Sequence, residues 1–158
     1  MMSRIDFEYT ITPAWEVVKT VDKKIKEIFT PNNDELLTAT SMVVSELIEN
    51  AVKYGEENGE CRSIDFKFHT ESHRIIIQVT NPVRAKDKLD IFKRHIREIE
   101  ESTNPLELYT RRLQELMENP GIKKTQLGLY RIAYEGQFKL SYMLKDNILT
   151  VEAVRDIL

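Results

Sequence analysis

The stretch from residue 34 to residue 55 constrains this chain most, because its apolar residues recur with the period of one long helix. Asp34 follows a Pro-Asn-Asn sequence that ends the preceding segment and caps the new helix, and Gly55 suits its C-terminal end. One arc of this helix is apolar and is expected to face a core. That arc is formed by Val43, Val44, Leu47, Ile48 and Ala51.

Three polar side chains lie in a row along the rim of the same helix. Glu46, Asn50 and Lys53 are one and two turns apart and fall within roughly 60° of one another around the helix axis. A carboxylate, an amide and a cation can serve as a proton acceptor, a metal ligand and a phosphate-pairing group. The alternative is a solvent-exposed ion pair beside an unrelated asparagine, and both interpretations stay open on geometry alone.

Length, charge and cysteine content limit the classes of function. The chain has 158 residues, enough for one domain with a real core. Its net charge of −3 gives no general attraction to nucleic acid or to anionic membranes. No apolar run approaches the roughly 20 residues of a transmembrane helix, and the first residues lack the apolar core of a signal peptide. Because the single cysteine, Cys61, cannot form an internal disulfide, we expect a cytoplasmic protein without nucleic-acid or membrane partners.

The remaining hydrophobic patterns predict the other elements and the fold class. Period-two alternation predicts strands at 4–11, 63–69, 74–79, 137–142 and 148–154. Helical spacing predicts helices at 12–29, at 84–118 with a break at 102–105, and at 126–133. We expect an α+β two-layer sandwich with a mixed, mostly antiparallel sheet of about five strands and helices on one face. Residues 1–158 are expected to form a single domain.

Some weaker signals allow two interpretations each. His69 and His73 bracket a hairpin turn without a cysteine or acidic cluster, so we expect no metal there. Six basic residues from Arg84 to Arg97 predict either a solvated helix face or a patch for anions. The helices within 84–118 have apolar faces that either pack on the core or present a surface to a partner. These faces are formed by Leu89, Phe92, Ile96 and Ile99, and by Leu106, Tyr109, Leu113, Leu116 and Met117.

The element order and one motif resemble the GHKL nucleotide-binding fold, the ATPase fold of gyrase, histidine kinases and mismatch-repair proteins. The motif is Glu46-x-x-x-Asn50-Ala followed by Lys53-Tyr-Gly. Bacterial anti-sigma-factor serine kinases are the branch most similar in size and motif, and the resemblance covers nearly the whole chain. It implies that Glu46 is the catalytic acid or base, that Asn50 binds Mg²⁺ beside the ATP phosphates, and that Lys53 contacts a phosphate.

Two further family motifs are altered, so that the glycine boxes are degenerate. Asn81 stands where the family has an aspartate that accepts a hydrogen bond from the adenine amino group, and Pro82 and Val83 follow in the glycine-containing stretch. The second glycine box keeps Gly128, which the resemblance places at the nucleotide phosphates, but has Gln126 in place of its first glycine.

The resemblance also bears on the last strand and on the lid. Thr150 resembles the strand threonine that supports the adenine contact. Residues 84–125 form a lid-like helical insertion where the family has a flexible lid. The helix that begins near residue 126 would offer backbone N–H groups at its N-terminus to a phosphate.

The resemblance leaves two classes of function. In the one we favour, the protein is a degenerate regulatory module that acts through protein-protein interaction and binds ATP weakly or not at all. In the other, it is an ATP- and Mg²⁺-dependent serine kinase that phosphorylates an antagonist protein. Both imply a protein partner of the sigma-factor or anti-sigma-antagonist type, and the resemblance also implies a homodimer. A detached module of a two-component kinase is disfavoured, because residues 1–11 already read as a strand and His95 lies in the lid region.

Overall fold

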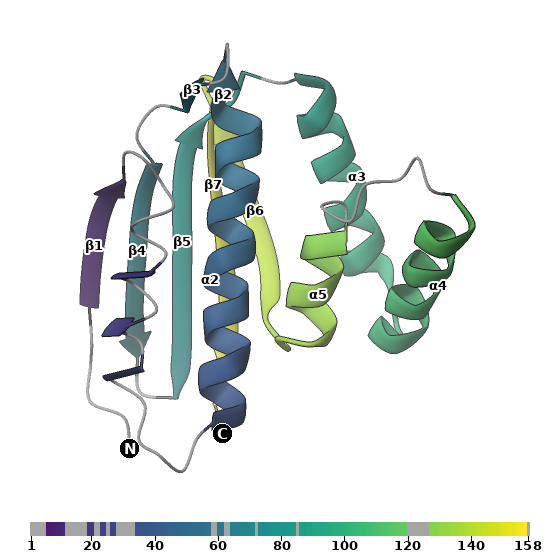
Figure 1. Ribbon diagram of the computed structural model, residues 1–158, viewed down its shortest axis with the longest axis horizontal. Coiled ribbons are helices and arrows are strands. Elements are labelled where there is room, and N and C mark those ends of the chain that lie inside the picture. The colour runs from purple at the N-terminus through teal and green to yellow at the C-terminus, as the bar shows by residue number, and fades with distance from the viewer. Residues whose placement is uncertain are drawn as a thin grey trace.

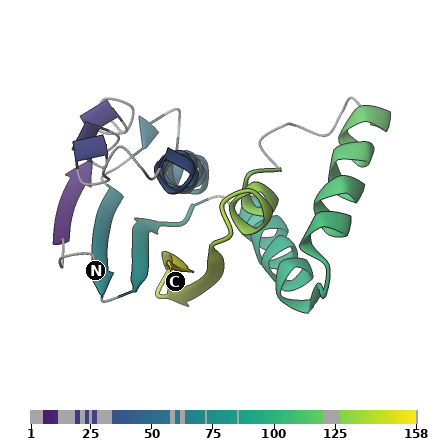
Figure 2. The ribbon, with the colours of Figure 1, turned by 90° about the horizontal axis from the view of Figure 1, so that it is seen from below.

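A computed structural model describes residues 6–11, 19–20, 23–24, 26–27, 34–57, 60–61, 64–71, 73–84, 86–119 and 127–157. The expected α+β class is confirmed, with helices layered against a sheet (Figures 1 and 2). The strands are β1 (Asp6–Ile11), β2 (Glu56–Glu57), β3 (Glu60–Cys61), β4 (Ile64–Glu71), β5 (Arg74–Pro82), β6 (Lys139–Lys145) and β7 (Ile148–Asp156). The described helices are α2 (Asp34–Gly55), α3 (Lys86–Glu101), α4 (Pro105–Glu118) and α5 (Gly128–Tyr134).

The main sheet has the strand order β1-β4-β5-β7-β6, and β2 and β3 form a separate pair. Each neighbouring pair of strands in the main sheet is antiparallel. The sequence led us to expect a mixed, mostly antiparallel sheet, and its antiparallel character is confirmed, whereas no parallel pair occurs among the described strands. Two of the pairs, β4–β5 and β6–β7, are hairpins, which can only join antiparallel neighbours.

The two faces of the sheet differ in burial. On one face, Ile75, Ile77 and Val79 of β5 are at most 1% exposed and pack beneath α2. The opposite face carries exposed polar side chains such as Lys67 of β4 and Ser141 of β6. Figure 2 shows α2 on one side of the sheet only. The strands therefore alternate between a core side and an open side, as expected for a two-layer arrangement.

Helix α3 belongs to the core. The predicted apolar residues Leu89, Phe92 and Ile96 of this helix are 8%, 0% and 1% exposed. They extend the core cluster of α2 and the sheet beyond the edge strand β6. For α3, the prediction that the helix packs on the domain's own core is therefore confirmed.

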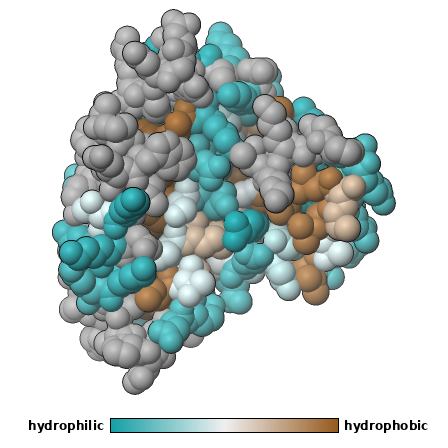
Figure 3. Space-filling view, in the orientation of Figure 1, coloured by the Kyte–Doolittle hydropathy of each residue, from teal (hydrophilic) through white to brown (hydrophobic). Residues whose placement is uncertain are grey.

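Helix α4 behaves differently. The predicted break before it is confirmed, because the Asn104 side chain accepts a hydrogen bond from the backbone N–H of Glu107, with Pro105 in the first turn. The predicted apolar stripe of α4 is only partly buried: Leu106 is 51% and Met117 83% exposed, whereas Tyr109, Leu113 and Leu116 are half-buried. Leu108, outside that stripe, is the buried residue of α4. Hydrophobic surface is visible on the α4 side of the molecule in Figure 3.

Parts of the sequence predictions lie outside the described residues. They include most of the expected helix at 12–29, and Gln126. In the described part of the chain, no helix has the length and hydrophobicity needed to cross a membrane.

Candidate functional site

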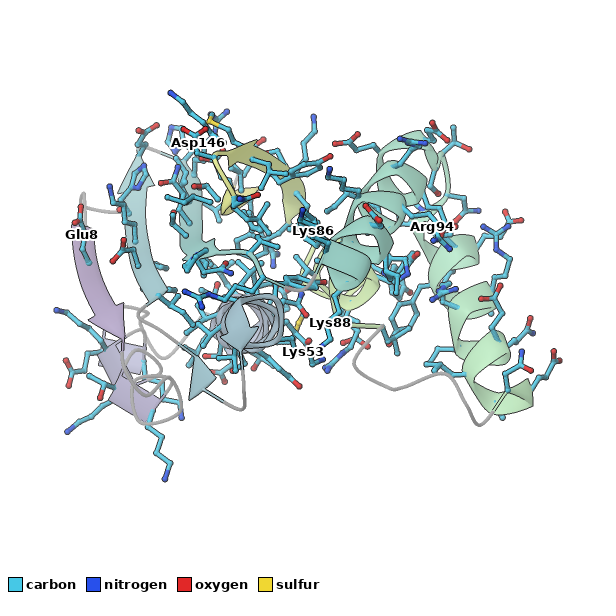
Figure 4. All side chains as sticks on the ribbon, turned by 90° about the horizontal axis from the view of Figure 1, so that it is seen from above. Glu8, Lys53, Lys86, Lys88, Arg94 and Asp146 are labelled. Carbon is cyan, nitrogen blue, oxygen red and sulfur yellow. The ribbon has the colours of Figure 1, made fainter. Side chains whose placement is uncertain are left out.

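The last turns of α2 carry the polar row that the sequence predicts as a site. The Glu46 side chain is 15% exposed, and Asn50 is 6% exposed. Lys53 is more accessible, and its Nζ lies 3.9 Å from the carboxylate of Glu49. Figure 4 shows Lys53 on the side of α2 that faces α3. The helix therefore brings these three side chains together while keeping two of them largely away from water.

The carboxylate of Glu46 is bound by an arginine that the sequence analysis did not select. Arg131 on α5 donates from Nη1 to Oε1 of Glu46 over 3.1 Å. The arginine side chain is 38% exposed, so one partner of this ion pair is half-accessible and the other is nearly covered. The arginine offsets part of the proton affinity that burial gives this carboxylate, and it occupies one of the oxygens that an incoming hydroxyl or water would approach.

Gly128 fixes how closely α5 approaches Glu46. A Cβ atom at Gly128 would lie 2.3 Å from Oε2 of Glu46, closer than real contacts allow, and a tight 3.2 Å from Cδ. A larger residue at this position would therefore force the Glu46 carboxylate to shift. In this structure the space beside Gly128 is occupied by Glu46.

Burial and charge act in opposite directions on Glu46. Burial raises the pKa of Glu46, and the neighbouring Glu49 raises it further. Arg131 and Lys53 oppose this shift, and the pKa remains above its usual value. The Glu46 pKa therefore depends on whether Arg131 stays in place.

Arg131 also binds a second carboxylate. Its Nε donates to Oε2 of Glu135 over 3.1 Å, and Oε1 of Glu135 accepts a hydrogen bond of 2.7 Å from the hydroxyl of Tyr109. The chain Tyr109–Glu135–Arg131–Glu46 thus joins α4, α5 and α2. Charge-assisted hydrogen bonds of this kind are stronger than neutral ones.

Asn81 lies near the end of β5 on the helix-facing side and is 2% exposed. Its Nδ2 donates to the backbone carbonyl of Pro82 over 3.0 Å, while its Oδ1 is buried without a hydrogen-bond partner among the described residues. An unpaired buried acceptor costs roughly 1–3 kcal/mol. The atom that the resemblance assigns to the adenine amino group is therefore oriented inward and lacks a donor.

Thr150 does not join Asn81. Its hydroxyl lies 3.0 Å from that of Thr80, its cross-strand neighbour. The neighbouring β7 residues Leu149 and Val151 face the core, so Thr150 faces the open side of the sheet. The structure places Thr150 and Asn81 on opposite faces.

The chain beyond Asn81 is held by backbone contacts. Val83 N–H donates to the carbonyl of Asn147 over 2.7 Å, and Arg84 N–H donates to the carbonyl of Tyr54 over 2.9 Å. The ring of Phe92 then packs edge-on between Tyr54 and Tyr142, with centroid distances of 5.4 Å to each. An aromatic cluster therefore seals the C-terminal end of α2 against α3 and β6.

The basic residues of α3 are mostly on the surface. Lys86, Lys88, Arg94 and Arg97 are exposed. Figure 4 shows Lys88 near the same side of α2 as Lys53. The arrangement fits the solvated helix face that was one of the two interpretations of this segment.

The sequence analysis missed Arg131, which binds Glu46, and Glu135, which binds Arg131. Their spacing of four residues is a helical signal, although Glu135 lies just beyond the helix predicted at 126–133. The contact of Arg131 with Glu46, 85 residues away, has no local sequence signal.

Among the described residues, no group of three His, Cys, Asp or Glu side chains gathers as metal ligands. A metal held here would depend on the amide oxygen of Asn50 and on ligands from outside the protein.

No family model matches the chain, and no curated protein matches it.

Proposed function

We propose that this chain is a regulatory signalling protein with a histidine-kinase-like ATPase fold, a degenerate relative of the anti-sigma-factor serine kinases. In this proposal it acts in the cytoplasm by binding a protein partner, and nucleotide binding is weak or absent. The observation that carries the proposal is the ion pair between Arg131 and Glu46, packed on Gly128. It occupies the carboxylate that a kinase would need as a free proton acceptor.

Two other features support the same proposal. The insertion at 84–125 contributes Phe92 to the core, where this side chain is 0% exposed. A nucleotide lid has to open and close, so it would not be anchored in the core in this way. Thr150 faces away from Asn81, so the two expected adenine contacts do not converge. A sigma-factor or anti-sigma-antagonist type of partner, and self-association as a homodimer, remain part of the proposal on the resemblance alone.

One observation favours the alternative, an active ATP- and Mg²⁺-dependent serine kinase. The buried Oδ1 of Asn81 has no partner among the described residues, and an adenine amino group would supply the missing donor. Asn50 would then hold Mg²⁺ beside the phosphates, and Glu46 would accept the proton of the target serine. This function requires Arg131 to leave Glu46 first.

Isothermal titration with Mg·ATP and Mg·ADP separates the two functions. We expect no heat, and no rise in melting temperature at millimolar nucleotide. Micromolar binding that Asn50→Ala abolishes would overturn the proposal and establish the kinase interpretation. The variant Arg131→Met tests the cause, because binding that appears only in this variant would mean that the ion pair alone blocks the site.

A further inference from the structure

We propose that the hydrogen-bonded chain Tyr109–Glu135–Arg131–Glu46 couples the docking of α4 to the masking of Glu46. Docked α4 keeps Arg131 on Glu46, and displacement of α4 releases that carboxylate. The inference deepens the proposed function by naming how the same site is regulated. It rests on three hydrogen bonds: 2.7 Å from Tyr109 to Glu135, 3.1 Å from Arg131 to Glu135, and 3.1 Å from Arg131 to Glu46.

Helix α4 is packed less deeply than α2 and α3, and Leu113 and Leu116 are only half-buried. Leu108 is the buried residue of this helix, whereas Leu106 and Met117 are 51% and 83% exposed. In Figure 1, α4 lies outside α5 and away from the sheet. An element that buries so little apolar surface opens at a lower free energy than the core helices.

A second set of contacts also holds α4 and identifies its inner side. The guanidinium of Arg112 lies 3.4 Å from Nε2 of His95 and 5.1 Å from the ring centre of Tyr130. Tyr130 in turn donates to Glu98 on α3 over 2.6 Å. Among the described residues, Arg112 and Tyr109 are the polar attachment points of α4 to the other helices, and of these Tyr109 is the one that connects to Glu46.

The positioning of Arg131 explains the coupling. Glu135 accepts from Nε of Arg131, while Nη1 of the same guanidinium binds Glu46. While α4 is docked, the Tyr109 hydroxyl fixes the carboxylate of Glu135, which in turn holds the guanidinium in the orientation that reaches Glu46. When α4 leaves, Glu135 loses this anchor, and Arg131 is no longer held on Glu46.

Coupling of this kind must be reciprocal. Loss of Glu46 leaves Arg131 held by Glu135 alone, which loosens Glu135 and so weakens its bond from Tyr109. A partner that displaces α4 would expose Glu46, and a ligand that binds Glu46 would loosen α4. This reciprocity gives a test that needs no knowledge of the partner.

The test is amide hydrogen exchange of α4 in four proteins: wild type, Tyr109→Phe, Glu46→Gln and the double variant. Amides of β5 in the same samples report global unfolding, so loss of overall stability is detected separately. We expect Glu46→Gln to speed exchange of the α4 amides about fivefold in the Tyr109 background and to leave it unchanged in the Tyr109→Phe background.

The control is Tyr134→Phe, which removes a neighbouring hydroxyl that makes no hydrogen bond within the described residues and is expected to leave α4 exchange unaltered. Equal acceleration by Glu46→Gln in both backgrounds, or none in either, would overturn the coupling. Because no nucleotide is present, the result does not depend on the titration that tests the proposed function. If the protein shows this coupling and also binds ATP, the inference stands and the proposed function is wrong.

Discussion

Individual polar side chains in the helical layer are positioned by burial and charge together, and Glu46 is the clearest case. It is nearly covered, paired with Arg131, and packed against a residue that has no Cβ. Removing any one of these features changes the other two, so single substitutions here are expected to be non-additive.

At Gly128 we predict that a methyl group is tolerated only when Glu46 is absent. Gly128→Ala forces the Glu46 carboxylate off α5 and should lower the free energy of unfolding by about 1–3 kcal/mol. In a Glu46→Ala background the same change should be neutral or slightly stabilising, because alanine is the better helix former. Urea denaturation of the four proteins measures this, and an equal loss in both backgrounds would contradict the contact.

His95 predicts a pH dependence of stability. It is 7% exposed, and burial, assisted by Arg112, lowers its pKa from 6.5 to about 4, with Arg94 acting in the same direction and Glu98 opposing. The unfolded state therefore takes up the proton first. The stabilisation is complete above about pH 6.5 and is lost as the pH falls toward about 4, by up to about 3 kcal/mol.

The variant His95→Gln isolates this contribution, because it shares all the other titrating groups with the wild type. The difference in unfolding free energy between the two proteins should change between pH 7 and pH 4 in the variant's favour. A difference that is constant with pH would show that His95 does not bind its proton differently in the two states.

Among the elements, α3 and α4 have similar sequence patterns but different roles. Both are amphipathic helices of the segment between β5 and α5, yet α3 packs into the core and α4 lies outside it. The difference arises from their neighbours, since α3 follows directly from β5 and contacts Tyr54 and Tyr142 through Phe92.

Matched truncations on the two helices should therefore differ strongly. Phe92→Ala is expected to cost about 3–5 kcal/mol, because a fully buried ring leaves a cavity. Leu106→Ala, at a 51% exposed position, should change the free energy of unfolding by less than about 0.5 kcal/mol. Denaturant titration measures both, and similar costs would mean that α4 packs more tightly than the structure shows.

Much of this organisation could be predicted from local sequence. The bounds of α2 follow from Asp34, its apolar arc and Gly55, and the break before α4 follows from Asn104-Pro105. These signals act within a few residues, which is why a single sequence contains them. The α+β class follows from the same local patterns.

Long-range relations could not be predicted in the same way. Whether Thr150 faces the core depends on the strand register, and a shift of one residue reverses it. Whether α4 is exposed depends on how α5 packs against the other helices, which the local sequence of α4 does not specify. Arg131 reaches Glu46 only because the whole fold brings α5 onto α2.

At the scale of the whole molecule, β5 and β7 form the centre of the sheet. β5 pairs with β4 on one side and β7 on the other, and the helical excursion of α3, α4 and α5 lies between β5 and β6 in the chain. The centre of the sheet therefore pairs two strands, β5 and β7, that are far apart in sequence.

This topology predicts the order of hydrogen exchange. Amides of β5 and β7 should exchange only through global unfolding and share one opening free energy, whereas those of the edge strand β1 should exchange through smaller openings. Exchange measured at several urea concentrations distinguishes the two classes. Faster exchange in β5 than in β1 would contradict the central position of β5.

The open face of the sheet has a practical consequence. Its side chains include Lys67 and Ser141, which are exposed and lie on the side away from α2. A fluorophore or surface tether attached there would leave the helical layer unobstructed. The molecule can therefore be immobilised in one defined orientation, with α2, α4 and α5 presented to whatever is passed over it.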